Sequence, residues 1–156
     1  VKAYATKVIR AIREIEPDAV ILVGCPHWDQ DIDLVAKSPI DGVSNVMYTL
    51  HFYAATHKDY LRDKLEAAIK SGLPVFVSEC AGMEASGNGP LAPEEYQKWL
   101  DVMEKNKVSW VNWSVSDKDE TCSMLLPRAK ATGNWTPDLI KPWGKMVKEA
   151  LTKYNN

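Results

Sequence analysis

One carboxylate stands where a buried strand is predicted to end. Residues 74–82, PVFVSECAG, form a run of apolar strand formers that closes on Glu79. A carboxylate at the end of a buried strand loses its hydration unless charges or hydrogen bonds replace it. Glu79 is therefore predicted to be either a paired structural ion or a reactive group able to attack a substrate carbon.

Two polar aromatic residues lie on the strand predicted before it. His51 and Tyr53 close the segment VSNVMYTLHFY, residues 43–53, and stand two positions apart. Alternate residues of a strand point to the same face, so both side chains are expected to reach one neighbour. The alternative is that they are ordinary strand residues whose polar tips are satisfied.

Two tryptophans sit beside polar residues in predicted loops. Trp28 occurs in PHWDQD and Trp113 in NWSVSDKDE. Flat aromatic rings at the mouth of a site suit the flat apolar faces of sugar rings, although tryptophans also cap protein cores.

These side chains must be positioned by alternating helices and strands. Apolar residues with helical spacing or in short buried runs predict helices near residues 1–15, 61–69, 94–106 and 143–151, and strands near 19–24, 43–53, 73–79 and 108–115. Four βα units of this kind predict an α/β fold with parallel strands. The longest irregular stretches, residues 25–42, 79–92 and 116–134, each follow the C-terminal end of a strand, which is where α/β folds build active sites.

Composition excludes several classes of protein. The chain has 156 residues, 46% of them apolar, and a formal net charge of -2, so it is expected to be globular and to bind no nucleic acid. No apolar run approaches the ~20 residues of a membrane span, and no signal peptide is recognisable at the N-terminus. Cys25, Cys80 and Cys122 lack the spacing of a zinc site and are interpreted as free thiols. No catalytic metal and no cofactor are expected.

The motifs together resemble glycoside hydrolase family 5, in particular bacterial cellulases of the endo-β-1,4-glucanase type. The segments that carry the resemblance are VIRAIREIEPDAVILVG, NVMYTLHFYAATHKDYLRDKLEAAI, LPVFVSEC and VNWSVSDKDE, which occur in the family's order from its fifth strand to its eighth. The resemblance implies that residues 1–156 are a single domain that forms half of a TIM (β/α)8 barrel. It lacks the first four βα units of that barrel, and with them the family's acid/base glutamate.

Roles are implied for seven residues of this chain. Glu79 matches the catalytic nucleophile, and His51 and Tyr53 match the pair that orients it. Trp113 and Trp28 match aromatic residues that bind sugar on either side of the cleavage point, whereas Lys118 and Glu120 match polar sugar contacts. Cys80 departs from the family, which usually has tryptophan after the nucleophile.

The second carboxyl group that retaining hydrolysis requires has no matching residue. Four acidic residues of nearby loops are candidates: Glu84, Asp117, Asp119 and Glu120. A half-barrel also exposes a sheet face and two strand edges, which favours association. We therefore expect either a homodimer, with two copies of Glu79 at one shared mouth, or pairing with a missing N-terminal half-barrel.

The resemblance implies internal hydrolysis of β-1,4-glucan, such as cellulose or carboxymethyl cellulose, in an extracellular setting. Two other readings stay open. In the first, the chain is a module that binds glucan without cleaving it. In the second, it is an incomplete fragment of a barrel.

Overall fold

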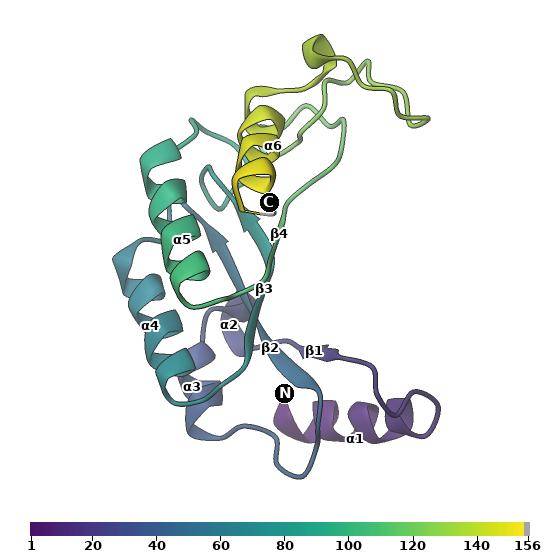
Figure 1. Ribbon diagram of the computed structural model, residues 1–156, viewed down its shortest axis with the longest axis vertical. Coiled ribbons are helices and arrows are strands. Elements are labelled where there is room, and N and C mark those ends of the chain that lie inside the picture. The colour runs from purple at the N-terminus through teal and green to yellow at the C-terminus, as the bar shows by residue number, and fades with distance from the viewer. Residues whose placement is uncertain (155–156) are drawn as a thin grey trace.

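The computed structural model describes residues 1–154, which form a sheet with helices packed on it (Figure 1). The strands are β1 (Ile21–Val23), β2 (Val46–Tyr53), β3 (Val75–Ala81) and β4 (Trp110–Asn112). The helices are α1 (Lys2–Arg13), α2 (Pro26–Asp29), α3 (Ile32–Lys37), α4 (Asp59–Lys70), α5 (Pro93–Lys105), the 3-10 helix η1 (Pro137–Leu139) and α6 (Pro142–Tyr154). Within this described part of the chain, none of the helices has the length and apolarity needed to cross a membrane.

The sheet has the order β1-β2-β3-β4, and every neighbouring pair is parallel. Each pair is joined through helical structure, which confirms the prediction of four parallel βα units. The prediction that residues 25–42 are irregular was wrong at α3, whereas α2 is a single turn in which His27 and Trp28 have non-helical backbone angles. Pro26 fits the first turn of α2, and Ile32, Val35 and Ala36 have the helical spacing that turns one face of α3 toward the core.

The outer face of the sheet is covered by helices of the chain itself, with α4 and α5 lying along it (Figure 1). Tyr48, Leu50 and Phe52 alternate along β2 and are buried on this side. The ring of Phe52 stacks on Trp99 of α5 with a centroid distance of 3.9 Å. Because the Trp99 indole N–H also donates to the carbonyl of His57 at 2.8 Å, this core is tied to the chain that follows β2.

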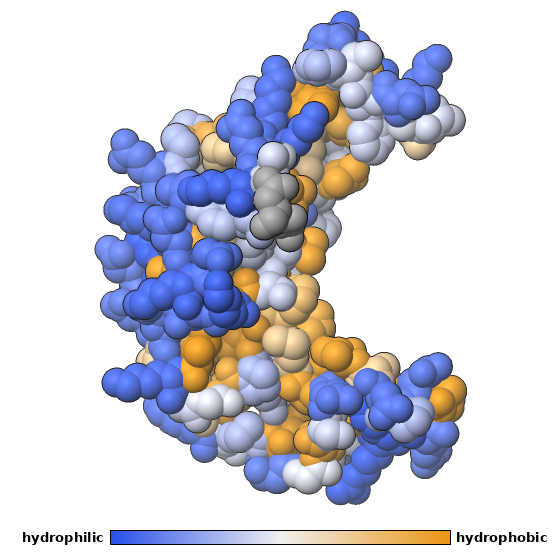
Figure 2. All heavy atoms as spheres, viewed as in Figure 1, coloured by the Kyte–Doolittle hydropathy of each residue, from blue (hydrophilic) through white to orange (hydrophobic). Residues whose placement is uncertain are grey.

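The inner face of the sheet is open. It lines the hollow of a crescent-shaped molecule, along which hydrophobic residues gather (Figures 1 and 2). Leu22 of β1 and Val111 of β4 are 41% and 51% exposed, although strand residues of this kind are ordinarily buried. The face therefore combines unburied apolar residues at both edges with polar residues on the two central strands.

Candidate active site

An extra residue in β3 brings two polar side chains opposite one residue of β2. The register runs from Leu50 opposite Val77 to His51 opposite Glu79, so Ser78 is the additional residue of a β-bulge. Strict alternation would place Ser78 and Glu79 on opposite faces. The bulge instead allows both of them to approach the ring of His51.

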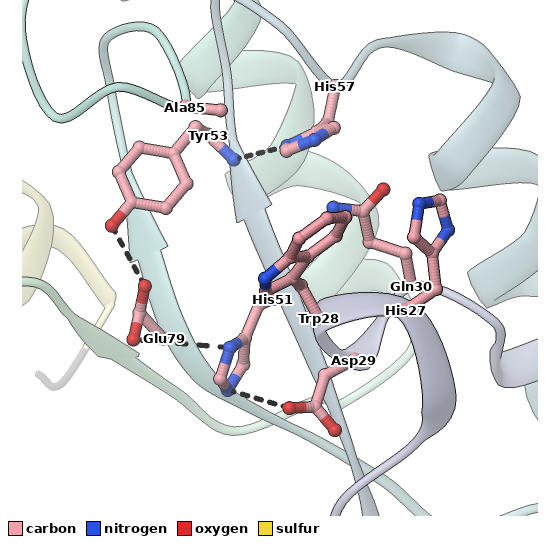
Figure 3. A pocket seen from close by; sticks show the side chains of 9 residues that line it. All are labelled: His27, Trp28, Asp29, Gln30, His51, Tyr53, His57, Glu79 and Ala85. Atoms are coloured by element: carbon pink, nitrogen blue, oxygen red, sulfur yellow. Dashed lines mark hydrogen bonds and ion pairs between the residues drawn. The ribbon is translucent and has the colours of Figure 1, made fainter.

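Glu79 is held between the two aromatic residues predicted to accompany it (Figure 3). The Tyr53 hydroxyl donates to Glu79 Oε1 at 2.8 Å, and His51 Nδ1 lies 4.0 Å from Glu79 Oε2. Burial, followed by the hydrogen bond to Glu79, raises the pKa of Tyr53 above its usual value. Tyr53 therefore remains a phenol that donates to the carboxylate throughout the neutral range.

The other nitrogen of His51 faces two further side chains. His51 Nε2 lies 2.8 Å from Ser78 Oγ and 3.6 Å from Asp29 Oδ2. The imidazole thus stands between the carboxylates of Glu79 and Asp29, which come from two different strand ends (Figure 3).

A cavity of about 690 Å³ opens over these groups. Its lining residues come from α2, from the ends of β2 and β3, and from the loops that follow those strands: His27, Trp28, Asp29, Gln30, His51, Tyr53, His57, Glu79 and Ala85. Trp28 is 78% exposed, so its indole is available at the rim rather than committed to the core. The cavity thus offers an aromatic face, several hydrogen-bonding groups and two carboxylates within one concave surface.

His57 fixes the backbone at the end of β2. Its Nδ1 accepts a hydrogen bond from the Tyr53 backbone N–H at 2.8 Å, which requires that nitrogen to carry no proton. Burial, with a smaller contribution from His27, lowers the pKa of His57. The neutral form is thereby favoured, and the backbone that carries the Tyr53 side chain is held in place.

The predicted sugar contacts in the loop after β4 lie outside this cavity. The backbone carbonyls of Lys118 and Glu120 accept hydrogen bonds from Lys141 Nζ at 3.0 and 2.9 Å, while the Glu120 carboxylate lies 3.6 Å from Cys122 Sγ. These contacts order the loop but do not bring either side chain to Glu79.

Trp113 follows β4 and lies beside the strand that carries Glu79. Its backbone N–H donates to the Cys80 carbonyl at 2.8 Å, and its own carbonyl accepts from the Trp143 indole. The side chain is 46% exposed, so its backbone is anchored while its ring remains accessible.

Sequence reasoning missed four polar residues of the cavity: His27, Asp29, Gln30 and His57. The available signal was their position, since Asp29 and Gln30 flank Trp28 in PHWDQD and His57 follows Tyr53 by four residues. Glu79 and Asp29 are the carboxylates that line the cavity in the described chain. The four acidic residues predicted as candidate partners of Glu79 do not line it.

Cys80 replaces the large residue expected beside Glu79 and is fully buried. Its Sγ lies 3.3 Å from the Val111 carbonyl and 3.2 Å from Asn112 Oδ1. Burial raises the pKa of the thiol well above its usual value, so it packs as a neutral group.

Across residues 1–154, no group of three or more His, Cys, Asp or Glu side chains is placed to hold a metal ion.

Comparison with protein families and relatives finds similarity over most of the chain. Residues 1–119 match the family model of cellulase (glycosyl hydrolase family 5). The chain is 42% identical over 151 residues to an endoglucanase of Clostridium saccharobutylicum, with 97% of this chain and 34% of that protein covered. It is 43% identical over 152 residues to endoglucanase 5 of Pectobacterium carotovorum, with 97% and 30% covered.

Solved structures match the fold closely. A protein from Cytophaga hutchinsonii superposes with a TM-score of 0.95 at 39% identity, over 99% of this chain and 51% of that one. Cellulase Cel5C_n superposes with a TM-score of 0.92 at 45% identity, over 97% of this chain and 46% of that one. The chain therefore spans about half the length of these solved chains and about a third of the two endoglucanases, and its four parallel βα units correspond to half of a barrel.

Proposed function

The chain belongs to glycosyl hydrolase family 5, and on this premise we propose that it cleaves β-1,4-glucan internally with Glu79 as the nucleophile. The observation that carries the proposal is the 2.8 Å hydrogen bond from Tyr53 to Glu79 at the floor of a cavity with an exposed aromatic rim. The endoglucanase names of the relatives support glucan as the substrate.

The chemistry follows from the two sides of the Glu79 carboxylate. One oxygen accepts from Tyr53, which leaves the other to attack the anomeric carbon as the bond to the leaving sugar breaks. Attack forms a glycosyl ester on Glu79, and water then cleaves that ester. The His51 ring packs beside Oε2, 4.0 Å away, and so limits the positions that this oxygen can adopt.

Sugar binding is assigned to residues around this carbon. Trp28 at the rim and Trp113 after β4 provide exposed indole faces for sugar rings. Lys118 and Glu120 remain candidates for polar contacts with a glucan chain that extends beyond the cavity, since their side chains lie in the loop after β4.

Protonation of the leaving oxygen requires a second carboxyl group about 5–5.5 Å from the first. We propose that residues 1–156 act as one half-barrel domain, equivalent to strands five to eight, and that a second copy completes the barrel. A two-fold axis along the barrel would place β4 beside the partner's β1, which preserves parallel pairing and buries Leu22 and Val111. Both copies of Glu79 would then face one mouth, whereas an N-terminal half-barrel would supply the family's acid/base residue instead.

A second candidate function is glucan binding without cleavage. It is favoured by one observation, namely that Asp29, the carboxylate that shares the cavity with Glu79, lies on the far side of the His51 ring. In that case the exposed tryptophans would bind the polymer and the glycosidic bond would remain intact.

Because the relatives are endoglucanases, we also propose an extracellular polymer as the target.

Reducing-sugar release from carboxymethyl cellulose tests the proposal. Glu79→Gln should reduce release by about 10³-fold or more, because the amide is no nucleophile. Glu84→Gln, in the loop after β3 and outside the cavity, is the matched control and should retain activity. Light scattering on the same samples should give the mass of two chains, and equal release by wild type and Glu79→Gln would overturn the assignment.

A further inference from the structure

The turn that follows β1 has an uncommon backbone. His27, Trp28 and Asp29 have φ values of 56°, 51° and 61°, so three consecutive residues other than glycine adopt the left-handed conformation. Such residues persist only where surrounding contacts hold them, and aspartate is among the residue types that tolerate this region best.

The Asp29 side chain supplies those contacts. Its Oδ1 accepts from the backbone N–H of Cys25, directly after β1, and from Thr49 Oγ1 at 2.5 Å, in the middle of β2. Gly24 leaves room for this arrangement, because a Cβ there would lie 3.3 Å from Asp29 Oδ1. One carboxylate oxygen therefore ties the turn that bears Trp28 to two strands of the sheet.

The second carboxylate oxygen is directed at the site. Asp29 Oδ2 lies 3.6 Å from His51 Nε2, and the same nitrogen lies 2.8 Å from Ser78 Oγ. Figure 3 shows Glu79, His51 and Asp29 in a row, with the imidazole between the two carboxylates. The ring is thus contacted by side chains from β3 and from the turn after β1, which restricts its rotation.

We propose that Asp29 is a positioning residue that holds His51, and through it Glu79, in the geometry for attack. Its negative charge beside Nε2 favours a proton on that nitrogen. Because Oδ1 is anchored to Cys25 and Thr49, Oδ2 is held beside the ring and restricts its rotation. Asp29 does not touch the reacting bond, because His51 lies between it and Glu79. The catalytic effect of Asp29 rests on the proposed hydrolysis. Its contact with the His51 ring does not depend on turnover.

Nitrogen-15 NMR of the imidazole rings tests the proposal without requiring activity. The chain has three histidines, so the His51 signals are assigned by their loss in His51→Gln. Wild type should show the proton on Nε2, and Asp29→Asn should shift both ring nitrogens toward a tautomer mixture. Asparagine retains the size of the side chain and tolerates the left-handed backbone, so the fold is expected to persist.

Asp31→Asn is the matched control. It removes the same charge two residues along the chain, where Asp31 contacts Lys64 and His27 rather than His51. The His51 signals should be unchanged in this variant. Thr49→Val provides a second test if Asp29→Asn fails to fold, because it removes the anchor of Oδ1 and leaves the charge, and it should shift the His51 signals less than Asp29→Asn.

Glucan hydrolysis then separates the inference from the proposed function. Asp29→Asn should lower kcat by about 10-fold to 100-fold with KM changed less than about twofold, because misplacement affects attack rather than binding. His51 signals that do not move in Asp29→Asn or Thr49→Val would overturn the positioning role, even if wild type hydrolyses glucan. An inactive wild type whose His51 signals respond to Asp29→Asn would refute the hydrolase proposal and leave the ring contact established.

Discussion

The two faces of the sheet differ in how much of each is covered by helices of this chain. On the outer face, Leu50 and Phe52 of β2 are fully buried beneath helices that the same chain provides. On the inner face, Leu22 and Val111 remain about half exposed, and the strands between them carry His51 and Glu79. The outer face therefore accounts for the stability of the fold, and the inner face holds the chemistry and lacks a cover.

This difference explains why a half-barrel can hold an ordered site. The Tyr53–Glu79 hydrogen bond and the contacts of His51 come from neighbouring strands whose backs are packed against the helices. Rigid strands position reacting groups more precisely than loops do. The site consequently depends on the outer core for its geometry, and in the proposed mechanism a second half supplies the other carboxyl group.

The largest difference between the faces should appear in stability. Phe52→Ala is expected to lower the free energy of unfolding by about 3–5 kcal/mol, because it removes a buried ring stacked on Trp99. Val111→Ala, on the inner face, should cost less than about 1 kcal/mol in a single chain and more in the proposed pair, which buries this side chain. Urea unfolding measures both, and equal losses would show that the inner face is buried in solution.

Tyr53→Phe should act on the chemistry and leave the core intact. The variant removes the hydroxyl that donates to Glu79, and a hydrogen bond to a charged group contributes about 1.5–3 kcal/mol. Accordingly kcat on glucan should fall by about 10-fold to 100-fold. The urea midpoint is the control, and an unchanged kcat would contradict the orienting role of Tyr53.

Leu22→Lys tests whether the exposed edge is an interface between copies. A charge at this position on β1 would have to be buried in the proposed pair, so the mass from light scattering should fall from that of two chains to that of one. Leu34→Lys on α3 introduces the same charge at a residue 51% exposed on the helical side and should leave the mass unchanged. A wild-type chain that is itself a monomer would contradict the pairing.

The smallest effect concerns pH and the end of β2. The pKa of His57 is lowered in the folded chain, so below about pH 6.5 the unfolded chain binds protons that the folded chain does not. The free energy of unfolding should therefore decrease as the pH falls below this value. In His57→Asn, whose amide oxygen can still accept from the Tyr53 N–H, the free energy of unfolding should fall less as the pH decreases. His27→Asn is the control.

Local patterns were sufficient to predict the scaffold. Apolar runs and helical spacing indicated the four strands and the helices α1, α4, α5 and α6, because these elements bury their own residues, whereas α2 and α3 were missed. The spacing of His51 and Tyr53 also indicated correctly that both would face one neighbour. The prediction failed where structure depends on pairing between strands, since nothing in PVFVSECAG reveals that Ser78 forms a bulge opposite His51.

Asp29 shows the second limit of prediction from the sequence. Its side chain reaches His51 because three consecutive residues turn into the left-handed region, and neither glycine nor a motif marks that turn. Its anchor on Thr49 joins segments 20 residues apart in the sequence. Lys118 and Glu120 illustrate the reverse case, since they match a motif but lie in a loop whose position is determined by contacts with Lys141.

The most direct test of Glu79 as the nucleophile is a covalent trap that does not need the missing carboxyl group. A dinitrophenyl cellobioside with fluorine in place of the hydroxyl next to the anomeric carbon departs as dinitrophenolate without protonation, and the fluorine slows hydrolysis of the ester. Intact-mass spectrometry should show one added fluorocellobiosyl group per wild-type chain, located on Glu79 after digestion, and none on Glu79→Gln. Labelling of another residue, or no labelling of wild type, would contradict the assignment.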